Sequence, residues 1–382
     1  MKKICFITTV SNTLKSVVLE IAKSLYEEYG YDITFICSDN VDFKKQLPEY
    51  IKFIPVNMKR GLDFKGIGVV YRLFRIFRKN KYDYIQYSTP NASFYASIAA
   101  WMAKSPIRLY GQWGIRYVGL SGIGRRILKI LEKITCIFST HIRPVSHNNM
   151  QFAIDEKLYN KKKSKVIGNG GTIGVDLKEF DISKKQELRT SIYEKFNITD
   201  DDFVFGFVGR ISRDKGSEEL LTAFKSLLEN NINAKLFMVG ANETEGIDND
   251  IIEWSKNSDN VIYTGKFPKS ELIQFYAAFD CYVHPTYREG FGMVLQEAGA
   301  MGNAIITTDI PGASEVMENN VSCMLVQPKD IGGLEKAMEY MISNRDKAEE
   351  IGKNAYIRTK TLYERSIMIA NIVEDIKDVI GG

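Results

Sequence analysis

The segment Tyr287-Arg288-Glu289-Gly290-Phe291-Gly292-Met293-Val294-Leu295-Gln296-Glu297-Ala298 comes just after an apolar run that ends in Pro285. Such a run predicts a buried parallel strand that ends at its proline. Gly290 and Gly292 then predict a tight turn, and the apolar pattern from Met293 to Met301 predicts a helix. Unpaired N–H groups and the helix dipole point into such a turn, so the segment predicts an anion-binding site.

Two carboxylates flank this predicted anion site. Glu289 stands just before the turn, and Glu297 lies about one turn into the helix, facing the same side. A phosphate between two acids is favourable only if the ligand also carries hydroxyl groups that the acids can bind. A nucleotide sugar meets both demands. The alternative is an ordinary junction of strand and helix with two solvated glutamates.

A second cluster of polar residues is the segment Gly209-Arg210-Ile211-Ser212-Arg213-Asp214-Lys215-Gly216, which follows a strand-like run and precedes a predicted helix. Arg210 can contact two phosphate oxygens at once, and Lys215 adds a compact charge. Two unpaired cations at a strand end are costly without an anionic ligand, so they indicate phosphate binding. The alternative for Lys215 is a surface ion pair with Glu218 or Glu219.

The length and composition limit the number of domains and the class of protein. The chain has 382 residues, of which 45% are hydrophobic, and this predicts two or three domains with proper cores. No apolar run approaches the roughly 18–20 residues of a membrane helix, and the N-terminus reads as a first strand instead of a signal peptide. The five cysteines are widely spaced and predict buried free thiols in a reducing cytosol. The three histidines lack metal-site spacing.

Positive charge is concentrated in the first half of the chain. The net charge is +4 overall, but it is +9 between Lys44 and Lys81 and +6 between Lys104 and Lys133. A basic face indicates a polyanionic partner, which can be an anionic membrane, a pyrophosphate-linked lipid or nucleic acid. Two predicted helices, residues 68–81 and 122–133, combine apolar and basic residues. They are either surface helices with solvated arginines or interfacial helices on anionic lipid.

Strand-like and helix-like runs alternate along the whole chain, which predicts parallel sheets with crossover helices. We place a domain boundary in the polar stretch near Asp181–Asp201, giving domains 1–185 and 186–361 with the last helix, 362–382, returning to the first domain. Two such halves predict a cleft at their interface, faced by strand carboxyl ends. The predicted strands are Ile4–Thr9, Ile33–Ser38, Lys52–Val56, Tyr84–Tyr87, Ile107–Gly111, Ile142–Val145, Val166–Asn169, Val204–Val208, Lys235–Val239, Val261–Thr264, Cys281–His284, Ala304–Thr307 and Met324–Val326.

Four motifs together resemble the second domain of retaining glycosyltransferases of the GT-B fold, specifically the large family numbered four, which includes glycogen synthases and bacterial polysaccharide transferases. These motifs are Gly209-Arg210…Lys215-Gly216, Phe237–Gly240, Thr264–Phe267 and Tyr287–Ala298 with its Glu289-x7-Glu297 pair. The resemblance covers residues 200–330 well. It implies two Rossmann-like domains with parallel sheets that face each other across a deep cleft.

The resemblance also implies roles for individual residues. The donor-binding set that it implies is Gly209, Arg210, Lys215, Phe267, Glu289, Gly290, Phe291, Gly292, Met293, Val294 and Glu297. Arg210 and Lys215 would neutralise the leaving diphosphate, and Glu289 would contact sugar hydroxyls, which makes these three the catalytic residues. Glu297 would bind the ribose, backbone N–H groups of Phe291 and Gly292 would support the phosphates or the sugar, and the main chain of Phe267 would meet the base. No metal or other cofactor is expected.

The first domain departs from the family pattern in two loops. Thr9-Val10-Ser11-Asn12-Thr13 stands where many members have a glycine pair, and Gly111-Gln112-Trp113-Gly114 stands where many have a histidine. Ser11 and Gln112 are therefore the acceptor-side candidates. His284, at the end of a strand near the donor motif, is expected to be a core or supporting residue.

The sequence thus predicts a retaining transferase that moves a hexose or N-acetylhexosamine from a UDP-sugar to a glycan acceptor. The acceptor is expected to be polyprenyl-pyrophosphate-linked, at the cytoplasmic membrane face, in the assembly of capsule or another surface polysaccharide, with no nucleic-acid partner. The alternatives are another GT-B activity, such as a sugar-nucleotide epimerase or a phosphorylase, and a non-catalytic two-lobed ligand sensor. A nicotinamide enzyme is disfavoured because no G-x-G-x-x-G follows the first strand.

Overall fold

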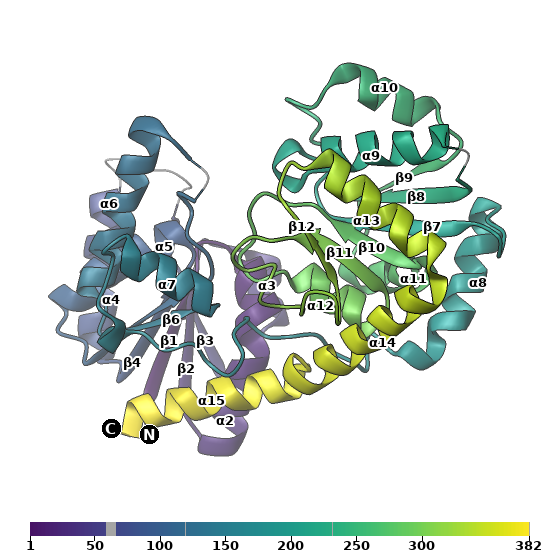
Figure 1. The fold of residues 1–382 in the computed structure, drawn as a ribbon. Coiled ribbons are helices and arrows are strands. Elements are labelled where there is room, and N and C mark those ends of the chain that lie inside the picture. The colour runs from purple at the N-terminus through teal and green to yellow at the C-terminus, as the bar shows by residue number, and fades with distance from the viewer. Residues whose placement is uncertain (59–65, 119, 231, 382) are drawn as a thin grey trace. The chain divides into compact units, whose positions relative to one another are not determined.

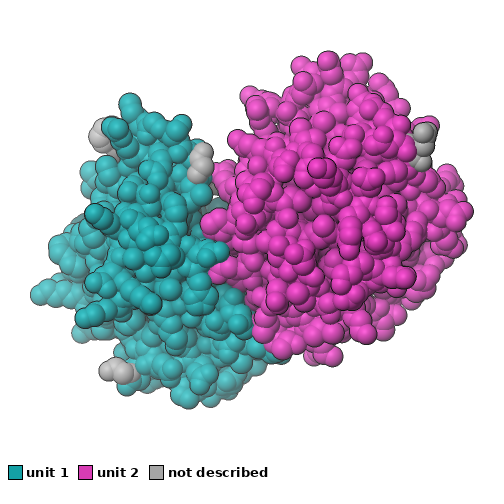
Figure 2. All heavy atoms as spheres, viewed as in Figure 1, with its two compact units in different colours: residues 1–173, 366–382 teal, residues 174–365 magenta. Residues whose placement is uncertain are grey.

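The computed structural model describes residues 1–58, 66–118, 120–230 and 232–381 (Figure 1). The chain divides into two compact units, which Figure 2 colours separately. The first unit comprises Met1–Ile173 and Ser366–Gly382, and the second comprises Gly174–Arg365. Residues 59–65 of the basic segment lie outside the described residues. No described helix is both long and apolar enough to cross a membrane.

The first unit is built on a six-stranded parallel sheet with the strand order β3-β2-β1-β4-β5-β6. Its strands are β1 Lys3–Ile7, β2 Asp32–Cys37, β3 Ile51–Pro55, β4 Tyr84–Ser88, β5 Ile107–Gln112 and β6 His141–Pro144. Its helices are α1 Ser11–Thr13, the π-helical η1 Leu14–Val18, α2 Leu19–Tyr29, α3 Val41–Gln46, α4 Gly66–Asn80, α5 Pro90–Met102, α6 Gly122–Phe138, α7 His147–Asp155, η2 Lys161–Lys163 and, after the second unit, α15 Arg365–Gly381.

The sheet of the first unit is buried on both faces. Neighbouring residues of a strand point to opposite faces, and in β1 Cys5 and Ile7 belong to one apolar cluster while Ile4 and Phe6 belong to another. Continuous apolar strands are therefore required, which is the pattern that the sequence shows. The prediction of buried free thiols is also confirmed, since all five cysteines are buried and unpaired.

The C-terminal helix α15 packs on the first unit, as predicted. Val373 and Ile376 lie in the same apolar cluster as Phe6. Asp375, which is 3% exposed, accepts a hydrogen bond from Arg143 Nε at 2.7 Å, and Lys165 Nζ lies 3.0 Å from its other oxygen. Because Asp375 is buried and contacts two cations, its ion pair with Arg143 of β6 fixes the position of α15 against that strand.

The prediction of a strand at Val166–Asn169 is wrong. Ser164 makes a single bridge to Ile142 of β6, but the chain then turns, with Gly170 N donating to Ile167 O at 2.9 Å. Gly168 has a φ of +53° and Gly170 a φ of +86°, conformations that L side chains rarely adopt. The glycine conformations therefore turn the chain away from β6, and no strand forms at residues 166–169.

The second unit has its own six-stranded parallel sheet, with the order β12-β11-β10-β7-β8-β9. Its strands are β7 Phe203–Val208, β8 Ala234–Val239, β9 Val261–Gly265, β10 Cys281–His284, β11 Ala304–Thr308 and β12 Met324–Val326. Its helices are η3 Ile182–Lys184, α8 Lys185–Phe196, η4 Arg213–Lys215, α9 Ser217–Glu229, α10 Asn249–Asn257, α11 Lys269–Ala278, α12 Met293–Ala300, α13 Ile331–Ser343 and α14 Arg345–Leu362.

The division between the units falls at 173/174, earlier than the expected 185/186. Val175 forms a parallel bridge with Glu364, and Arg365 Nη1 donates to Asp176 at 3.2 Å, so the segment is tied to the second unit before the polar stretch begins. That stretch, which we expected to be a linker, contains α8, and Arg189 of this helix lies 2.8 Å from Asp280 at the base of β10.

Candidate functional site

The predicted donor motifs meet at the carboxyl ends of β7 and β10 in the second unit. These two strands are neighbours in the sheet, and the chain order reverses between them, since β8 follows β7 on one side and β11 follows β10 on the other. Ligands of open parallel sheets bind at such a reversal, outside the carboxyl ends of the strands. The loops that continue from β7 and β10 carry Arg210, Lys215 and Glu289.

Gly216 allows the two loops to approach each other. Its φ is +71°, and a Cβ at this position would lie 2.0 Å from the carbonyl oxygen of Pro285. Only glycine permits this contact between the end of η4 and the residue that follows β10. Tyr287 N donates to Asp214 O at 3.0 Å and continues the contact. The pairing of the loops places Lys215 beside Glu289.

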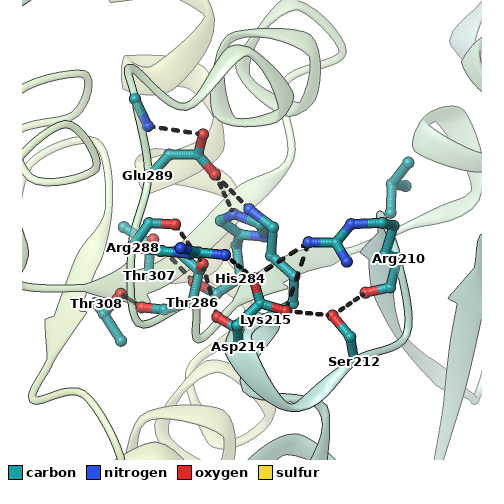
Figure 3. A network of polar contacts seen from close by, with 12 residues as sticks. Arg210, Ser212, Asp214, Lys215, His284, Thr286, Arg288, Glu289, Thr307 and Thr308 are labelled. Carbon is teal, nitrogen blue, oxygen red and sulfur yellow. Dashed lines mark hydrogen bonds and ion pairs between the residues drawn. The ribbon is translucent and has the colours of Figure 1, made fainter. Parts of the chain in front are cut away.

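Glu289 is held by two side chains (Figure 3). Its Oε2 lies 2.8 Å from Lys215 Nζ and 3.2 Å from His284 Nε2. Burial opposes ionisation of this carboxyl, but the hydrogen bond from His284 and the charge of Lys215 outweigh it and hold the pKa of Glu289 well below its usual range. The carboxylate is therefore charged, and the backbone N–H of Gly290 donates to its Oε1 at 3.0 Å.

His284, which the sequence placed in a core or supporting role, contacts Glu289 in this cluster. It is 1% exposed, and burial lowers its pKa although Glu289 raises it, so the imidazole is neutral. Its Nδ1 lies 3.3 Å from the hydroxyl oxygen of Tyr282, whose single proton goes either to this nitrogen or to Val208 O, 3.2 Å away. The neutral ring thus presents its Nε2–H to Glu289. The sequence signal for it was a polar residue at the end of an apolar strand.

Both cations have acidic partners, which corrects the expectation that they are unpaired. Arg210 Nη1 lies 2.6 Å from Glu243 Oε2, and its Nη2 lies 3.1 Å from Asp214 Oδ2. Arg288 Nη2 contacts the same Asp214 oxygen at 3.3 Å, so two guanidinium groups share one acid (Figure 3). The partner of Lys215 is Glu289, neither Glu218 nor Glu219. The argument that two unpaired cations require an anionic ligand is therefore wrong, although about half of the Arg210 side chain is exposed to solvent.

The turn before α12 has the backbone expected of an anion site. Gly292 is the N-cap in a left-handed conformation with a φ of +51°, and no side chain caps the helix. Phe291 is 4% exposed and packs its ring against Tyr363, so only its backbone can meet a ligand. Met293 and Val294 are half-buried in the first turn of the helix. The N–H groups at this end remain the natural anion donors.

Glu297 belongs to a separate pair of contacts. It is 6% exposed, its Oε2 accepts a hydrogen bond from Tyr276 at 3.1 Å, and Lys269 Nζ lies 3.0 Å from its Oε1. Phe267, after β9, packs against Phe275 of α11 with ring centroids 4.9 Å apart. The helix that carries Tyr276 and Lys269 therefore links the two outer members of the predicted donor set.

The two acceptor-side candidates lie in the first unit and differ in accessibility. Ser11 is half-buried, and its hydroxyl accepts a hydrogen bond from Asn40 Nδ2 at 2.9 Å. Gln112, the last residue of β5, is fully buried and donates to Glu132 Oε1 at 2.6 Å. Among the described residues, no group of His, Cys, Asp and Glu side chains is arranged to hold a metal ion.

Comparisons with known proteins agree with the fold and the motifs. Residues 189–358 match the family described as glycosyl transferases group 1, and residues 3–143 match the one described as glycosyl transferase 4-like. The capsular polysaccharide biosynthesis glycosyltransferase CapM of Staphylococcus aureus is 29% identical over 370 residues, which cover 96% of this chain and 94% of CapM. The Escherichia coli UDP-Gal:alpha-D-GlcNAc-diphosphoundecaprenol alpha-1,3-galactosyltransferase is 23% identical over 322 residues, covering 81% of this chain and 79% of that protein.

Among solved structures, HepE of Anabaena in complex with UDP and glucose superposes with a TM-score of 0.76 and 20% identity, covering 99% of this chain and 100% of that one. A likeness at this identity establishes the fold. The two parallel six-stranded sheets, the two family matches and this likeness lead to one conclusion: the chain belongs to the group 1 glycosyltransferases and has their two-domain GT-B fold.

Proposed function

We propose that the protein is a retaining glycosyltransferase that moves a hexose or N-acetylhexosamine from a UDP-sugar to a polyprenyl-diphosphate-linked glycan during assembly of a surface polysaccharide. The observation that carries the proposal is the cluster of Lys215, His284 and Glu289 at the carboxyl ends of β7 and β10. The names of the relatives support the finer assignment, since CapM acts in capsule synthesis and the Escherichia coli enzyme uses UDP-galactose and a diphosphoundecaprenol-linked acceptor.

In this proposal the cations neutralise the leaving diphosphate. Arg210 and Lys215 exchange part of their contacts with Asp214, Glu243 and Glu289 for the two phosphates of the donor. The N–H groups of Gly292 and Met293 at the start of α12 support the same charge. As the bond from the anomeric carbon to the diphosphate breaks, its electron pair leaves with UDP, and these fixed charges stabilise the transition state. The oxygen of an acceptor hydroxyl group forms the new bond to the anomeric carbon, and the proton of that hydroxyl passes to the departing diphosphate.

The carboxylates bind hydroxyl groups and do not bind phosphate. Glu289 is charged and held in place by His284, so its open side accepts hydrogen bonds from the donor sugar. Glu297 binds the ribose hydroxyls, and the main chain at Phe267 meets the base. No metal is required in this scheme because arginine, lysine and the helix dipole supply the positive charge. Activity that survives a chelator such as EDTA tests this part of the proposal.

The first test is thermal stabilisation of the purified protein by UDP, GDP, ADP and CMP. A nucleotide that binds only the folded state raises the melting temperature by mass action. We expect a selective shift with UDP that is lost in Lys215→Ala, followed by UDP release when the matching UDP-sugar is added. No shift with any of the nucleotides would contradict the proposal, and a shift without turnover would favour a sensor.

We also propose that α6 contacts an anionic membrane. Its outward residues Ile123, Ile127, Ile130 and Ile137 are 74%, 45%, 57% and 55% exposed, beside the exposed cations Arg126 and Lys133. An exposed apolar stripe flanked by basic residues is typical of an interfacial helix.

Helix α4 is less suited to this role, although it carries the same kind of sequence. Its stripe, which includes Leu73 and Phe77, packs on the core, and Arg72 donates to Pro55 O at 2.8 Å. Ile127→Glu with Ile130→Glu should release the protein from vesicles that contain phosphatidylglycerol. Arg72→Glu, Arg75→Glu and Arg78→Glu together should weaken co-sedimentation less. Unchanged co-sedimentation in both variants would refute membrane contact at an inner face.

A further inference from the structure

The first unit contains a partly open pocket of about 150 Å³ that none of the predicted donor residues lines. It lies at the carboxyl ends of β4 and β5, because Pro90 and Asn91 begin α5 directly after β4, and Arg116 and Tyr117 follow β5. Side chains of α5 and α6 close it. This is the edge of the sheet at which open parallel sheets bind ligands.

A buried acid forms one wall of this cavity. Glu132 of α6 lines it and is 8% exposed. Its Oε1 accepts hydrogen bonds from Tyr110 at 2.9 Å and Gln112 at 2.6 Å, and Gln112 in turn accepts one from Tyr159 at 3.0 Å. Tyr110 and Gln112 both donate to the same carboxyl oxygen of Glu132, Oε1. The network therefore fixes the orientation of the carboxyl group and leaves Oε2 without a hydrogen bond from the described residues.

The other walls are mainly apolar and aromatic. Phe94 and Tyr95 come from α5, Tyr117 from the loop after β5, and Leu128 and Leu131 from α6. An apolar chain in this space would leave the buried carboxyl without a partner, which is costly. Arg116 is the one cation among the described lining residues, and it is exposed, whereas the polar group on the inner wall is the acid Glu132. A ring with an apolar face and several hydroxyl groups fits both the walls and the acid.

We propose that this cavity is a subsite for one sugar residue of the acceptor, with Glu132 bound to its hydroxyl groups. Burial raises the pKa of Glu132 to about 7, so near neutrality the carboxyl can both donate to and accept from a hydroxyl group. The volume of about 150 Å³ suits a single ring and its substituents, and any further sugar of the acceptor would extend out of the opening. The proposal rests on the proposed transferase function, because it identifies the ring as part of the acceptor.

The position of the cavity also fits a lipid-linked acceptor. Helix α6 presents Ile127 and Ile130 outward while Leu128, Leu131 and Glu132 face the cavity. If the outer face lies on a membrane, a sugar attached to a lipid headgroup is close to the inner face of the same helix. One helix would then hold both the membrane and the acceptor sugar.

The test is ligand-observed saturation-transfer NMR on the full chain with the methyl glycosides of glucose, galactose, N-acetylglucosamine and N-acetylgalactosamine. We expect at least one glycoside to bind the native protein. Glu132→Gln should weaken that binding about tenfold, since a hydrogen bond to a charged or polarised group is lost. Leu128→Trp, which fills the cavity, should abolish it. Ile137→Trp, on the exposed side of the same helix, is the matched control and should bind normally.

Two results would overturn the inference: no binding of any glycoside to the native protein, or unchanged binding in both Glu132→Gln and Leu128→Trp. Thermal stabilisation by UDP, measured on the same samples, separates this inference from the proposed function. A normal UDP shift without glycoside binding would refute the subsite alone. Glycoside binding that depends on Leu128, without any UDP shift, would keep the subsite and refute the transferase proposal.

Discussion

Two glutamates that are largely removed from water, one in each unit, have their pKa values shifted in opposite directions. Glu289 and Glu132 are both largely removed from water, and each accepts two hydrogen bonds from side chains. The pKa of Glu289 is held well below its usual range, whereas that of Glu132 rises to about 7. Burial alone therefore does not decide the charge of an acid in this protein.

The difference comes from the partners. Burial raises both pKa values, but Glu289 has the hydrogen bond from His284 at 3.2 Å and the ammonium group of Lys215 at 2.8 Å, while Glu132 has only the neutral donors Tyr110 and Gln112. Neutral hydrogen bonds recover part of the lost solvation, and a nearby cation recovers more. A permanent negative charge on Glu289 suits a site where it must hold the ammonium group of Lys215 in position. A titratable carboxyl group such as that of Glu132 suits the binding of neutral hydroxyl groups.

The largest expected effect is loss of activity in Glu289→Gln. The amide keeps the size of the side chain but lacks the negative charge that Lys215 and His284 contact in Glu289. We expect the rate of UDP release from the preferred UDP-sugar to fall by about 10²–10³. Glu253→Gln, an exposed position in the same unit, should leave the rate unchanged. A variant of Glu289 with near-native turnover would remove it from the catalytic set.

The second effect is on stability and concerns Glu132. An unfolded glutamate loses its proton near pH 4.3, whereas Glu132 in the folded chain keeps its proton up to about pH 7. Between these values the folded state binds more protons, so its stability falls as the pH rises. Above pH 7 the cost is about 3 kcal/mol.

Glu132→Gln should remove this cost. Urea unfolding should show the variant gaining stability relative to the native protein between pH 4 and pH 8, with little difference at pH 4. A difference that does not change with pH would mean that Glu132 is ionised throughout, like Glu289.

A smaller effect is expected from His284, which acts through Glu289. His284→Ala removes a hydrogen bond to a charged group and should lower kcat about tenfold, with little change in KM for the UDP-sugar. His284→Gln places an N–H donor in a similar position and should recover most of the loss. If both variants lower activity equally, or if KM alone changes, the ring is part of the core and does not position Glu289.

The smallest effect is the coupling between Lys215 and Glu289 in the free protein. Each side chain is 19% exposed, so we expect a coupling energy of about 1 kcal/mol from a double-mutant cycle with Lys215→Met and Glu289→Gln. The coupling should weaken below pH 4, because protonation of the acid removes the stability that its lowered pKa provides. A coupling energy near zero at pH 7 would mean that His284, not Lys215, determines the charge of Glu289.

Much of this organisation was predictable from the sequence. Continuous apolar runs such as Phe203–Val208 identify strands that are buried on both faces, and their alternation with amphipathic segments identifies parallel sheets. Gly290 and Gly292 predicted the turn before α12, where Gly292 is the N-cap. These signals are local, because each depends only on residues within a few positions of one another.

Other features were missed because distant residues decide them. The strand expected at Val166–Asn169 is ended by glycine conformations, and the boundary near residue 185 moves because Val175 pairs with Glu364. Helices α4 and α6 show the same mixture of apolar and basic residues, yet the apolar stripe of α4 packs inward while four isoleucines of α6 point outward. The spacing of apolar residues in the sequence predicts an apolar stripe on each helix, but it does not show whether that stripe packs against the rest of the unit or faces solvent.

By itself the sequence determined the two parallel sheets, the family motifs and the residue types at the turn before α12. These features depend on residues that are close together in the sequence, because burial patterns and turn geometry are local. Only the tertiary structure decided the partner of each charged group. Lys215 meets Glu289 because Gly216 lets the loop after β7 pack against Pro285, and Glu132 meets Gln112 and Tyr110 because α6 packs beside β5. A pKa depends on atoms within a few ångströms, and folding alone chooses those atoms.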